Sequence, residues 1–158
     1  MKKFVSLFTG MLMIVSVFAQ TNFQELTLEK ALEKAKSEHK KVFVDCYTSW
    51  CGPCKMMAEK VLPLKEGGEN MNERFVFFNT HFVNVKFDME KGEGPDLARK
   101  YKVTAYPTFL VLQTDGSLMQ RVVGGTLDGK EFIQKVDAAF DENSAANLEA
   151  EYVAGNRE

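Results

Sequence analysis

The chain has 158 residues, of which 45% are hydrophobic and 27% are charged, and its formal net charge is −2. This length and mixture are typical of one globular domain with a packed core, to which 13 phenylalanines can contribute. A net charge so close to zero leaves no strong basic field for a nucleic-acid backbone, so we expect no nucleic-acid partner.

Residues 1–19 have the pattern of a secretory signal peptide. Lys2 and Lys3 precede a mostly apolar stretch of about fifteen residues, and small residues stand at the positions that a signal peptidase requires before a cut after Ala19. No second hydrophobic span follows, so we expect an exported mature chain, in the periplasm, that does not span a membrane. A retained membrane anchor is the alternative, although the stretch is short for a spanning helix.

The region after this segment predicts a helix, a strand and a second helix. Apolar residues recur at helical spacing over residues 26–40, and Thr27 is placed to cap the start of this helix. The run KVFVDC, residues 41–46, favours a buried strand that one acid, Asp45, interrupts. Residues 54–64 again have a helical pattern, which Pro63 is expected to end or kink.

The second half predicts three more strands and two more helices. After a glycine-containing loop and a short helical turn up to residue 78, the expected elements are strand 82–87, helix 95–101, strands 108–113 and 118–123 joined by a tight turn, and helix 128–140. A βαβ unit with a parallel, right-handed crossover is thus followed by an antiparallel ββα unit. We expect an α/β domain over residues 20–141, with a mixed sheet of about four strands flanked by helices, and a polar tail over residues 142–158.

The stretch SWCGPCKMM places Cys51 and Cys54 where a helix follows a strand. Unpaired backbone N–H groups and the helix dipole favour a thiolate at Cys51, and Cys54 lies one turn further on the same side. Gly52 lets another backbone approach the sulfur closely, and Pro53 suits an early helical position. Trp50 can shield the site. The stretch is typical of a nucleophilic thiol with a resolving partner.

Two other uses of the cysteine pair stay open. A zinc site needs about four ligands, but the other candidates, Cys46, His39 and His81, are not paired at ligand spacing, so we expect no metal. A structural disulfide is common in exported proteins, but one across so short a loop removes little entropy from the unfolded chain. Cys46 points away from the side chain of Asp45, its neighbour on the strand, and is expected to be buried and inert, with a regulatory mixed disulfide as the alternative.

Four short motifs together resemble the thioredoxin superfamily. They are Val44-Asp45, Trp50-Cys51-Gly52-Pro53-Cys54-Lys55, Tyr106-Pro107-Thr108 and Gly124-Gly125. The resemblance covers roughly residues 26–140, and the sequence around the motifs is similar to exported bacterial thioredoxin-like domains, including the C-terminal domain of the membrane transporter that delivers reducing power to the periplasm. It implies a thioredoxin fold and dithiol–disulfide exchange without a cofactor.

The resemblance also implies a role for each matching residue. Cys51 would be the attacking thiol and Cys54 the resolving thiol, with a disulfide between them in the oxidised form. Pro107 would follow a cis peptide bond and aim the Tyr106 backbone at the substrate chain. Asp45 would be a buried acid that takes a proton from Cys54, with a strand-end cap or an ion pair as the alternative. The residues expected to contact substrate are Trp50, Gly52, Pro53, Tyr106 and Pro107.

Three features depart from ordinary thioredoxin. We expect the first strand of the larger fold to be missing, with the helix that begins near Leu26 in its place, and the segment over residues 64–82 is long. The basic residue often found near the buried acid has no clear match, and Asn84 or Lys86 would fill its position.

We expect an exported oxidoreductase that reduces protein disulfides, because a Gly-Pro pair between the cysteines resembles the reducing members. Such a reductase would need a membrane thiol donor as a second partner. The alternatives are a disulfide oxidase or isomerase, and a thioredoxin-fold binding or chaperone module whose cysteines are idle.

Overall fold

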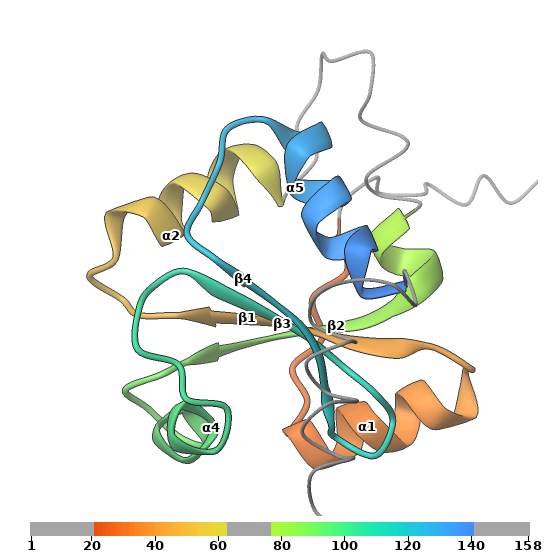
Figure 1. Ribbon diagram of the computed structural model, residues 1–158. Coiled ribbons are helices and arrows are strands. Elements are labelled where there is room, and N and C mark those ends of the chain that lie inside the picture. Colours follow the sequence, from red (N-terminus) through yellow and green to blue (C-terminus); the bar gives the residue numbers. More distant parts are fainter. Residues whose placement is uncertain (1–20, 63–76, 141–158) are drawn as a thin grey trace, which may run out of the picture.

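The computed structural model describes residues 21–62 and 77–140, and Figure 1 shows a sheet with helices on both of its faces. In chain order the elements are α1 (Leu28–Ser37), β1 (Lys41–Tyr47), α2 (Gly52–Met56), a π-helical turn (Met57–Val61), β2 (Phe82–Asp88), α4 (Gly94–Lys100), β3 (Thr108–Leu112), β4 (Leu118–Val123), α5 (Gly129–Asp137) and a 3-10 turn (Ala138–Phe140). Residues 77–81 are also helical. The predicted α/β fold class and order of elements are confirmed. The expected signal peptide, the Pro63 break, most of the loop before β2 and the polar tail lie outside the described residues.

The sheet has the order β2-β1-β3-β4, with β1 in an inner position. β1 runs parallel to β2 and antiparallel to β3, and β3 is antiparallel to β4. The register places Asp45 of β1 between Lys86 of β2 and Phe109 of β3. The mixed topology predicted from the βαβ and ββα units is therefore confirmed.

Successive residues of β1 point to opposite faces of the sheet and so contribute to two separate cores. Val42, Val44 and Cys46 pack against α1 and α4, which lie together below the sheet in Figure 1. Phe43 belongs to the other core, under α5 and the π-helical turn, and its ring centroid lies 4.8 Å from that of Phe78. Asp45 lies two residues after Phe43 and therefore points to the same face of the sheet. The alternation of side chains along β1 thus places an acid on the face that carries α2.

Side-chain caps fix where two of the helices begin. The Thr27 hydroxyl accepts a hydrogen bond from the Lys30 N–H at 3.3 Å, as the sequence predicts, and Glu93 accepts one from the Leu28 N–H at 3.2 Å. Asp128 caps α5 in the same way, by accepting from the N–H of Lys130 at 2.8 Å. The contact of Glu93 also ties the start of α1 to the loop that precedes α4.

A short N-terminal strap, residues 21–24, lies along the outer edge of β2. It makes one isolated parallel bridge, between Phe23 and Asn84, and the Gln24 N–H donates to the Asn84 carbonyl at 2.9 Å. Among the described residues a single bridge thus occupies the outer edge of β2. The expectation that the first strand is missing stays a prediction, because residues 1–20 lie outside the described residues.

Gly94, the first residue of α4, is packed too closely for any side chain. A Cβ atom there would lie 1.9 Å from the Asp88 carbonyl oxygen, which belongs to the backbone and cannot rotate away. We expect Gly94→Ala to lower the free energy of unfolding by about 2 kcal/mol, because the turn between β2 and α4 must shift. Urea unfolding measures this loss.

Gly52→Ala is the matched control for this prediction. No heavy atom lies within 4 Å of the position that its Cβ would take. Equal losses of stability in the two variants would contradict the steric explanation.

Candidate active site

The two motif cysteines meet at the start of α2. Cys51 is the N-cap residue, Pro53 lies in the first turn, and a disulfide joins Cys51 to Cys54 with their Cα atoms 5.2 Å apart. The Cys51 sulfur also accepts a hydrogen bond from the Cys54 N–H at 3.1 Å. Both cysteines are nearly buried, with 3% and 5% of their surfaces exposed. The expected disulfide is present, and the backbone donor aimed at Cys51 is of the kind that stabilises a thiolate.

The segment before β3 reaches the same edge of the sheet. The Tyr106–Pro107 peptide bond is cis, as the resemblance implies. Thr108 pairs with Cys46 near the end of β1, so Pro107 lies beside the loop that leads from β1 to Cys51. The rings of Trp50 and Tyr106 contact edge to face, with centroids 6.1 Å apart. The structure therefore brings the aromatic residues of the two motifs together.

Glu90 holds the side chain of Trp50 in place. The indole N–H of Trp50 donates to the Glu90 carboxylate at 3.0 Å, although 65% of the Trp50 surface is exposed. No sequence motif points to Glu90, because it lies in the turn after β2.

The glycine pair after β4 packs against the helix that carries the cysteines. Gly124 has a φ of +87°, a conformation that favours glycine, and its N–H donates to the Pro107 carbonyl at 2.8 Å. A Cβ atom on Gly125 would lie 3.0 Å from the Met57 side chain. This close approach lets the loop after β4 lie between the start of β3 and the helix.

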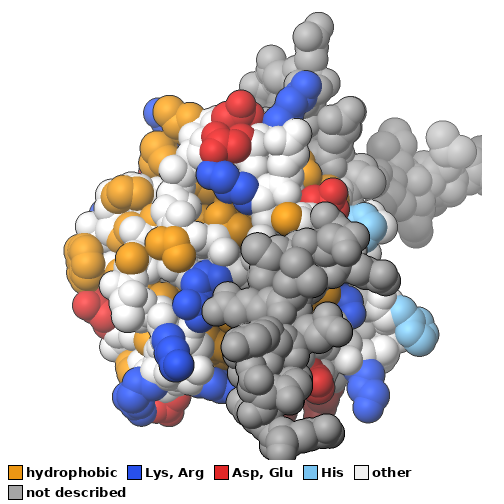
Figure 2. Space-filling model, in the orientation of Figure 1, with side chains coloured by type: hydrophobic (Ala, Val, Ile, Leu, Met, Phe, Trp, Pro, Cys, Tyr) orange, Lys and Arg blue, Asp and Glu red, His pale blue; other side chains and the backbone are white. Residues whose placement is uncertain are grey.

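Figure 2 shows hydrophobic side chains gathered on the side of the molecule where α2 begins, at the left of the view. Trp50 and Val123 are among the large hydrophobic residues that the described part of the chain exposes. Exposed apolar surface around a reactive group is typical of a docking site for another chain.

Asp45 is a buried acid close to the cysteine pair. Only 6% of its surface is exposed, and its Oδ1 atom has no hydrogen-bond partner among the described residues. Burial raises the pKa of Asp45 to about 7, and the charge of Lys86 opposes this increase. Lys86, its register partner, thus fits the expected basic position, whereas the Asn84 amide donates to the Phe78 carbonyl.

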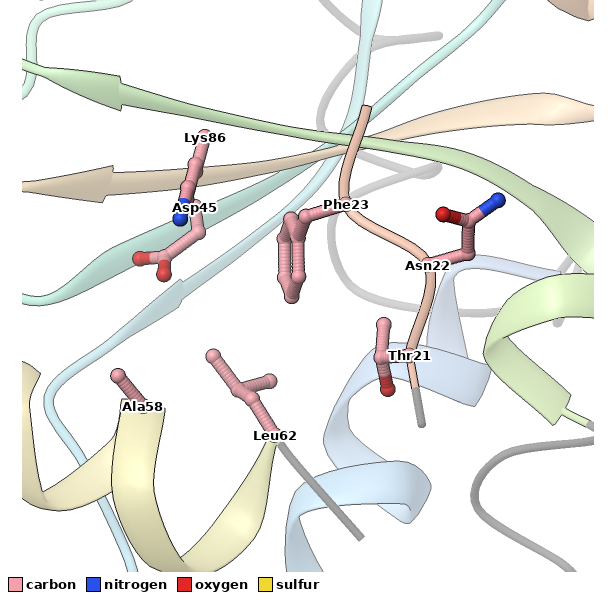
Figure 3. Close-up of a pocket in the computed structure, with 7 residues that line it drawn as sticks. All are labelled: Thr21, Asn22, Phe23, Asp45, Ala58, Leu62 and Lys86. Atoms are coloured by element: carbon pink, nitrogen blue, oxygen red, sulfur yellow. The ribbon is translucent and has the colours of Figure 1, made fainter. Parts of the chain in front are cut away.

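Two cavities meet at Asp45. One, of about 210 Å³, is lined by Cys54, Asp45, Ala58 and Lys86, together with Tyr47, Thr48, Ser49 and Lys55. The other, of about 280 Å³ and shown in Figure 3, is lined by Thr21, Asn22, Phe23, Asp45, Ala58, Leu62 and Lys86. Asp45 therefore faces the resolving cysteine on one side and the strap on the other. Such spaces have room for several water molecules and polar groups to hold them.

The third cysteine is separate from this site. Cys46 is buried and unbonded on the opposite face of β1, and burial raises the pKa of its thiol. A buried, protonated thiol is unreactive, in agreement with the prediction of an inert residue.

His39 and His81 are exposed, and within residues 21–62 and 77–140 no three His, Cys, Asp or Glu side chains cluster as a metal site would require. In the same ranges no helix is long and apolar enough to cross a membrane.

Comparison with known families agrees with this geometry. The sequence model of the thioredoxin-like domain family matches residues 28–140, which include every motif quoted above. The chain belongs to the thioredoxin-like family. Family membership and the CXXC disulfide together support thiol–disulfide oxidoreductase chemistry.

Individual relatives extend the comparison. Thioredoxin-2 of Pyricularia oryzae is 36% identical over 109 residues, which are 69% of this chain and 56% of that protein, so the chain spans just over half the length of this curated relative. A protein from Bacteroides thetaiotaomicron, solved in solution as a "putative disulphide-isomerase", is 42% identical with a TM-score of 0.66, and the match covers 78% of this chain and 96% of that one. A structure named DsbH oxidoreductase shares the fold, with 24% identity, a TM-score of 0.56 and coverage of 82% and 92%.

The burial of Asp45 predicts a dependence of stability on pH. The raised pKa, about 7 against 3.8 for the free group, means that the folded chain keeps a proton which the unfolded chain releases above pH 3.8. Stability therefore falls as pH rises, and the cost is complete above about pH 7. We expect Asp45→Asn to remove this dependence, so that its stability advantage over the native chain grows by about 4 kcal/mol between pH 4 and pH 8.

Urea unfolding of the two oxidised proteins across this pH range measures the difference. If the difference in free energy of unfolding between the two proteins stayed constant with pH, Asp45 would have the same pKa in the folded and unfolded chains. That result would contradict the effect of burial on its pKa.

Proposed function

We propose that this protein reduces disulfide bonds in other proteins by thiol–disulfide exchange. The observation that carries the proposal is the Cys51–Cys54 pair at the start of α2, with the buried acid Asp45 across a cavity that Cys54 also lines. A nucleophile, a resolving thiol and a proton acceptor are then within one small site.

The first step is attack by the reduced site on a substrate disulfide. The Cys51 thiolate attacks one sulfur, forms a mixed disulfide with it and releases the other substrate sulfur as a thiolate, which takes a proton from water. Backbone donors at the start of α2, such as the Cys54 N–H, stabilise the thiolate form of Cys51.

The second step restores the disulfide seen in the structure. Cys54 loses its proton to Asp45, and the new thiolate attacks the Cys51 sulfur of the mixed disulfide. A bond forms between Cys51 and Cys54, and the substrate leaves with its second sulfur reduced. An Asp45 pKa of about 7 suits this role, because the group can both accept and release a proton near neutral pH.

The substrate would lie on the exposed face around the cysteines. Its backbone would pair with that of Tyr106, before the cis bond to Pro107, in the manner of an added strand. Trp50, fixed by Glu90, would cover one side of the bound chain, and Gly52 and Pro53 would contact it next to Cys51. These assignments rest on the geometry of the site and on the resemblance of its motifs.

The proposal also includes a direction of electron transfer, from the cysteine pair to the substrate disulfide. The Gly52-Pro53 pair favours a reductant, whereas the likeness to a protein described as a disulphide isomerase favours an enzyme that reshuffles disulfides. The pattern of residues 1–19 supports export, and a reductase outside the cytosol would require a membrane thiol donor to reduce Cys51 and Cys54 again.

The reduction potential of the cysteine pair tests this direction. We expect a value of roughly −270 mV after equilibration of the purified protein with defined glutathione mixtures, because this is the range of reducing thioredoxins. A value of roughly −120 mV would instead identify a disulfide-forming oxidant and overturn the assignment.

Single cysteine variants test the mechanism. We expect Cys51→Ser to lower turnover of insulin disulfides at least about 100-fold, because the nucleophile is lost, and Cys54→Ser to accumulate a mixed disulfide with substrate. Non-reducing mass spectrometry detects that adduct.

Cys46→Ala is the matched control, because it removes the one cysteine that lies on the other face of the sheet. Its turnover should equal that of the native protein. Full biological activity in Cys51→Ser would favour a binding or chaperone module instead.

A further inference from the structure

The cavity on the strap side of Asp45 has no role in the exchange steps written above. Asp45, Ala58 and Lys86 line both this cavity and the one shared with Cys54, so the two spaces meet at the acid. Ala58 and Lys86 are exposed, which places the opening to solvent beside them. The strap residues form the wall on the far side, and Figure 3 shows the Phe23 ring pointing into the space between Asp45 and Leu62.

Water in the cavities beside Asp45 can supply the hydrogen bonds that the described residues do not give to its Oδ1 atom. Its Oδ1 atom is buried without a partner among the described residues, and a buried carboxylate in that position is costly unless water reaches it. The proton that Asp45 takes from Cys54 must also return to solvent before the next cycle. The amount of water in this cavity therefore affects both the charge that Asp45 can carry and its exchange of protons.

The strap is built to hold an apolar ring at this wall. The Phe23–Asn84 bridge and the Gln24 N–H bond fix its backbone to β2, and the Asn22 N–H donates to the Asn79 side chain at 2.9 Å. The Phe23 ring also lies 6.4 Å, between centroids, from the ring of Phe43 in the core. Attachment on both sides gives the ring a defined place.

We propose that Phe23 is a positioning residue that limits the water around Asp45 and thereby sets the pH range in which the acid can accept a proton from Cys54. The effect of Phe23 on the water around Asp45 is inferred from the shared cavity. The consequence for proton transfer from Cys54 rests on the proposed function. It assigns to the strap a role in the chemistry, where sequence analysis noted only a missing strand.

Other ionisable groups near Asp45 are the same in all the variants below. Among the described residues, Lys86 faces it from β2, Cys54 and Lys55 from α2 and Tyr47 from the end of β1, while Cys46 lies beside it on the opposite face. Use of the oxidised protein removes the titration of Cys54, which would otherwise couple to that of Asp45. The remaining variable is then the wall of the cavity.

The test is the titration of the Asp45 carboxyl by NMR in the full-length oxidised protein labelled with ¹³C-aspartate. We expect Phe23→Ala to lower the pKa of Asp45 by about one unit, because loss of the ring admits water and reduces the desolvation of the carboxylate. Phe23→Leu, which keeps an apolar wall, should stay close to the native value. Ala58→Leu, which narrows the opening, should shift the pKa upwards.

Leu26→Ala is the matched control for a merely structural effect. Leu26 lies two residues after the strap, but it packs against the core on the α1 and α4 face, away from Asp45. The inference is overturned if Phe23→Ala leaves the titration unchanged, or if Leu26→Ala shifts it equally. Should Phe23→Ala fail to fold, Phe23→Val, whose side chain is larger than that of Ala but leaves more of the cavity open than that of Leu, must still lower the pKa of Asp45.

The same variants separate this inference from the proposed function. The rate at which the mixed disulfide resolves is measured against pH for the native protein and for Phe23→Ala. If the Asp45 titration moves and the rate profile moves with it, both are supported. If the titration moves and the rate profile does not, the proton-accepting role of Asp45 fails, whereas the control of its hydration by Phe23 stands.

Discussion

The register of β1 between its two neighbours is the constraint on which the rest of the site depends. Because side chains alternate along a strand, a slip of one residue would exchange the faces of Asp45 and Cys46. Asp45 would then lie among the apolar side chains under α1 and α4, and a thiol would replace it under the active-site helix. The two phenylalanines on the face of Asp45, Phe43 in β1 and Phe109 in β3, pack with ring centroids 5.7 Å apart and oppose such a slip. The aromatic core thus fixes the position of the acid as well as the fold.

Much of this arrangement could be predicted from the sequence, because the decisive signals are local. The alternation in residues 41–46, the cap at Thr27 and the glycine and proline residues around the turns each act over a few positions. They place the cysteines at the junction of a strand and a helix, and the order of elements then leaves few topologies. The cis bond before Pro107 could be predicted only from the resemblance of its motif to the thioredoxin superfamily. No local pattern in the chain separates a cis from a trans bond at this proline.

The sequence could not predict contacts that join distant segments through side chains. Glu90 reaches Trp50 across 40 positions, and nothing in either local sequence marks the pair. Phe23 lines the Asp45 cavity because one isolated bridge to Asn84 holds the strap against β2. The sequence around Phe23 has no strand pattern that would predict this bridge. The choice between Asn84 and Lys86 also required the structure. Both residues lie on the same face of β2, and only the register with β1 decides which of them is level with Asp45.

Asp45 and Cys46 show how burial alone can have opposite consequences for function. Burial raises the pKa of both groups, because a low-dielectric surrounding disfavours the charged form. For a thiol this increase moves ionisation further from neutral pH, so Cys46 becomes inert. For a carboxyl the same change moves ionisation towards neutral pH, where proton transfer is useful, at a cost in stability when the group is charged. Lys86 offsets part of that cost, but it is exposed to solvent and cannot cancel it. An acid in this position is therefore better explained by a requirement of the chemistry than by stabilisation of the fold. The cavities beside Asp45 have room for water, and water there would lower the cost of its charge.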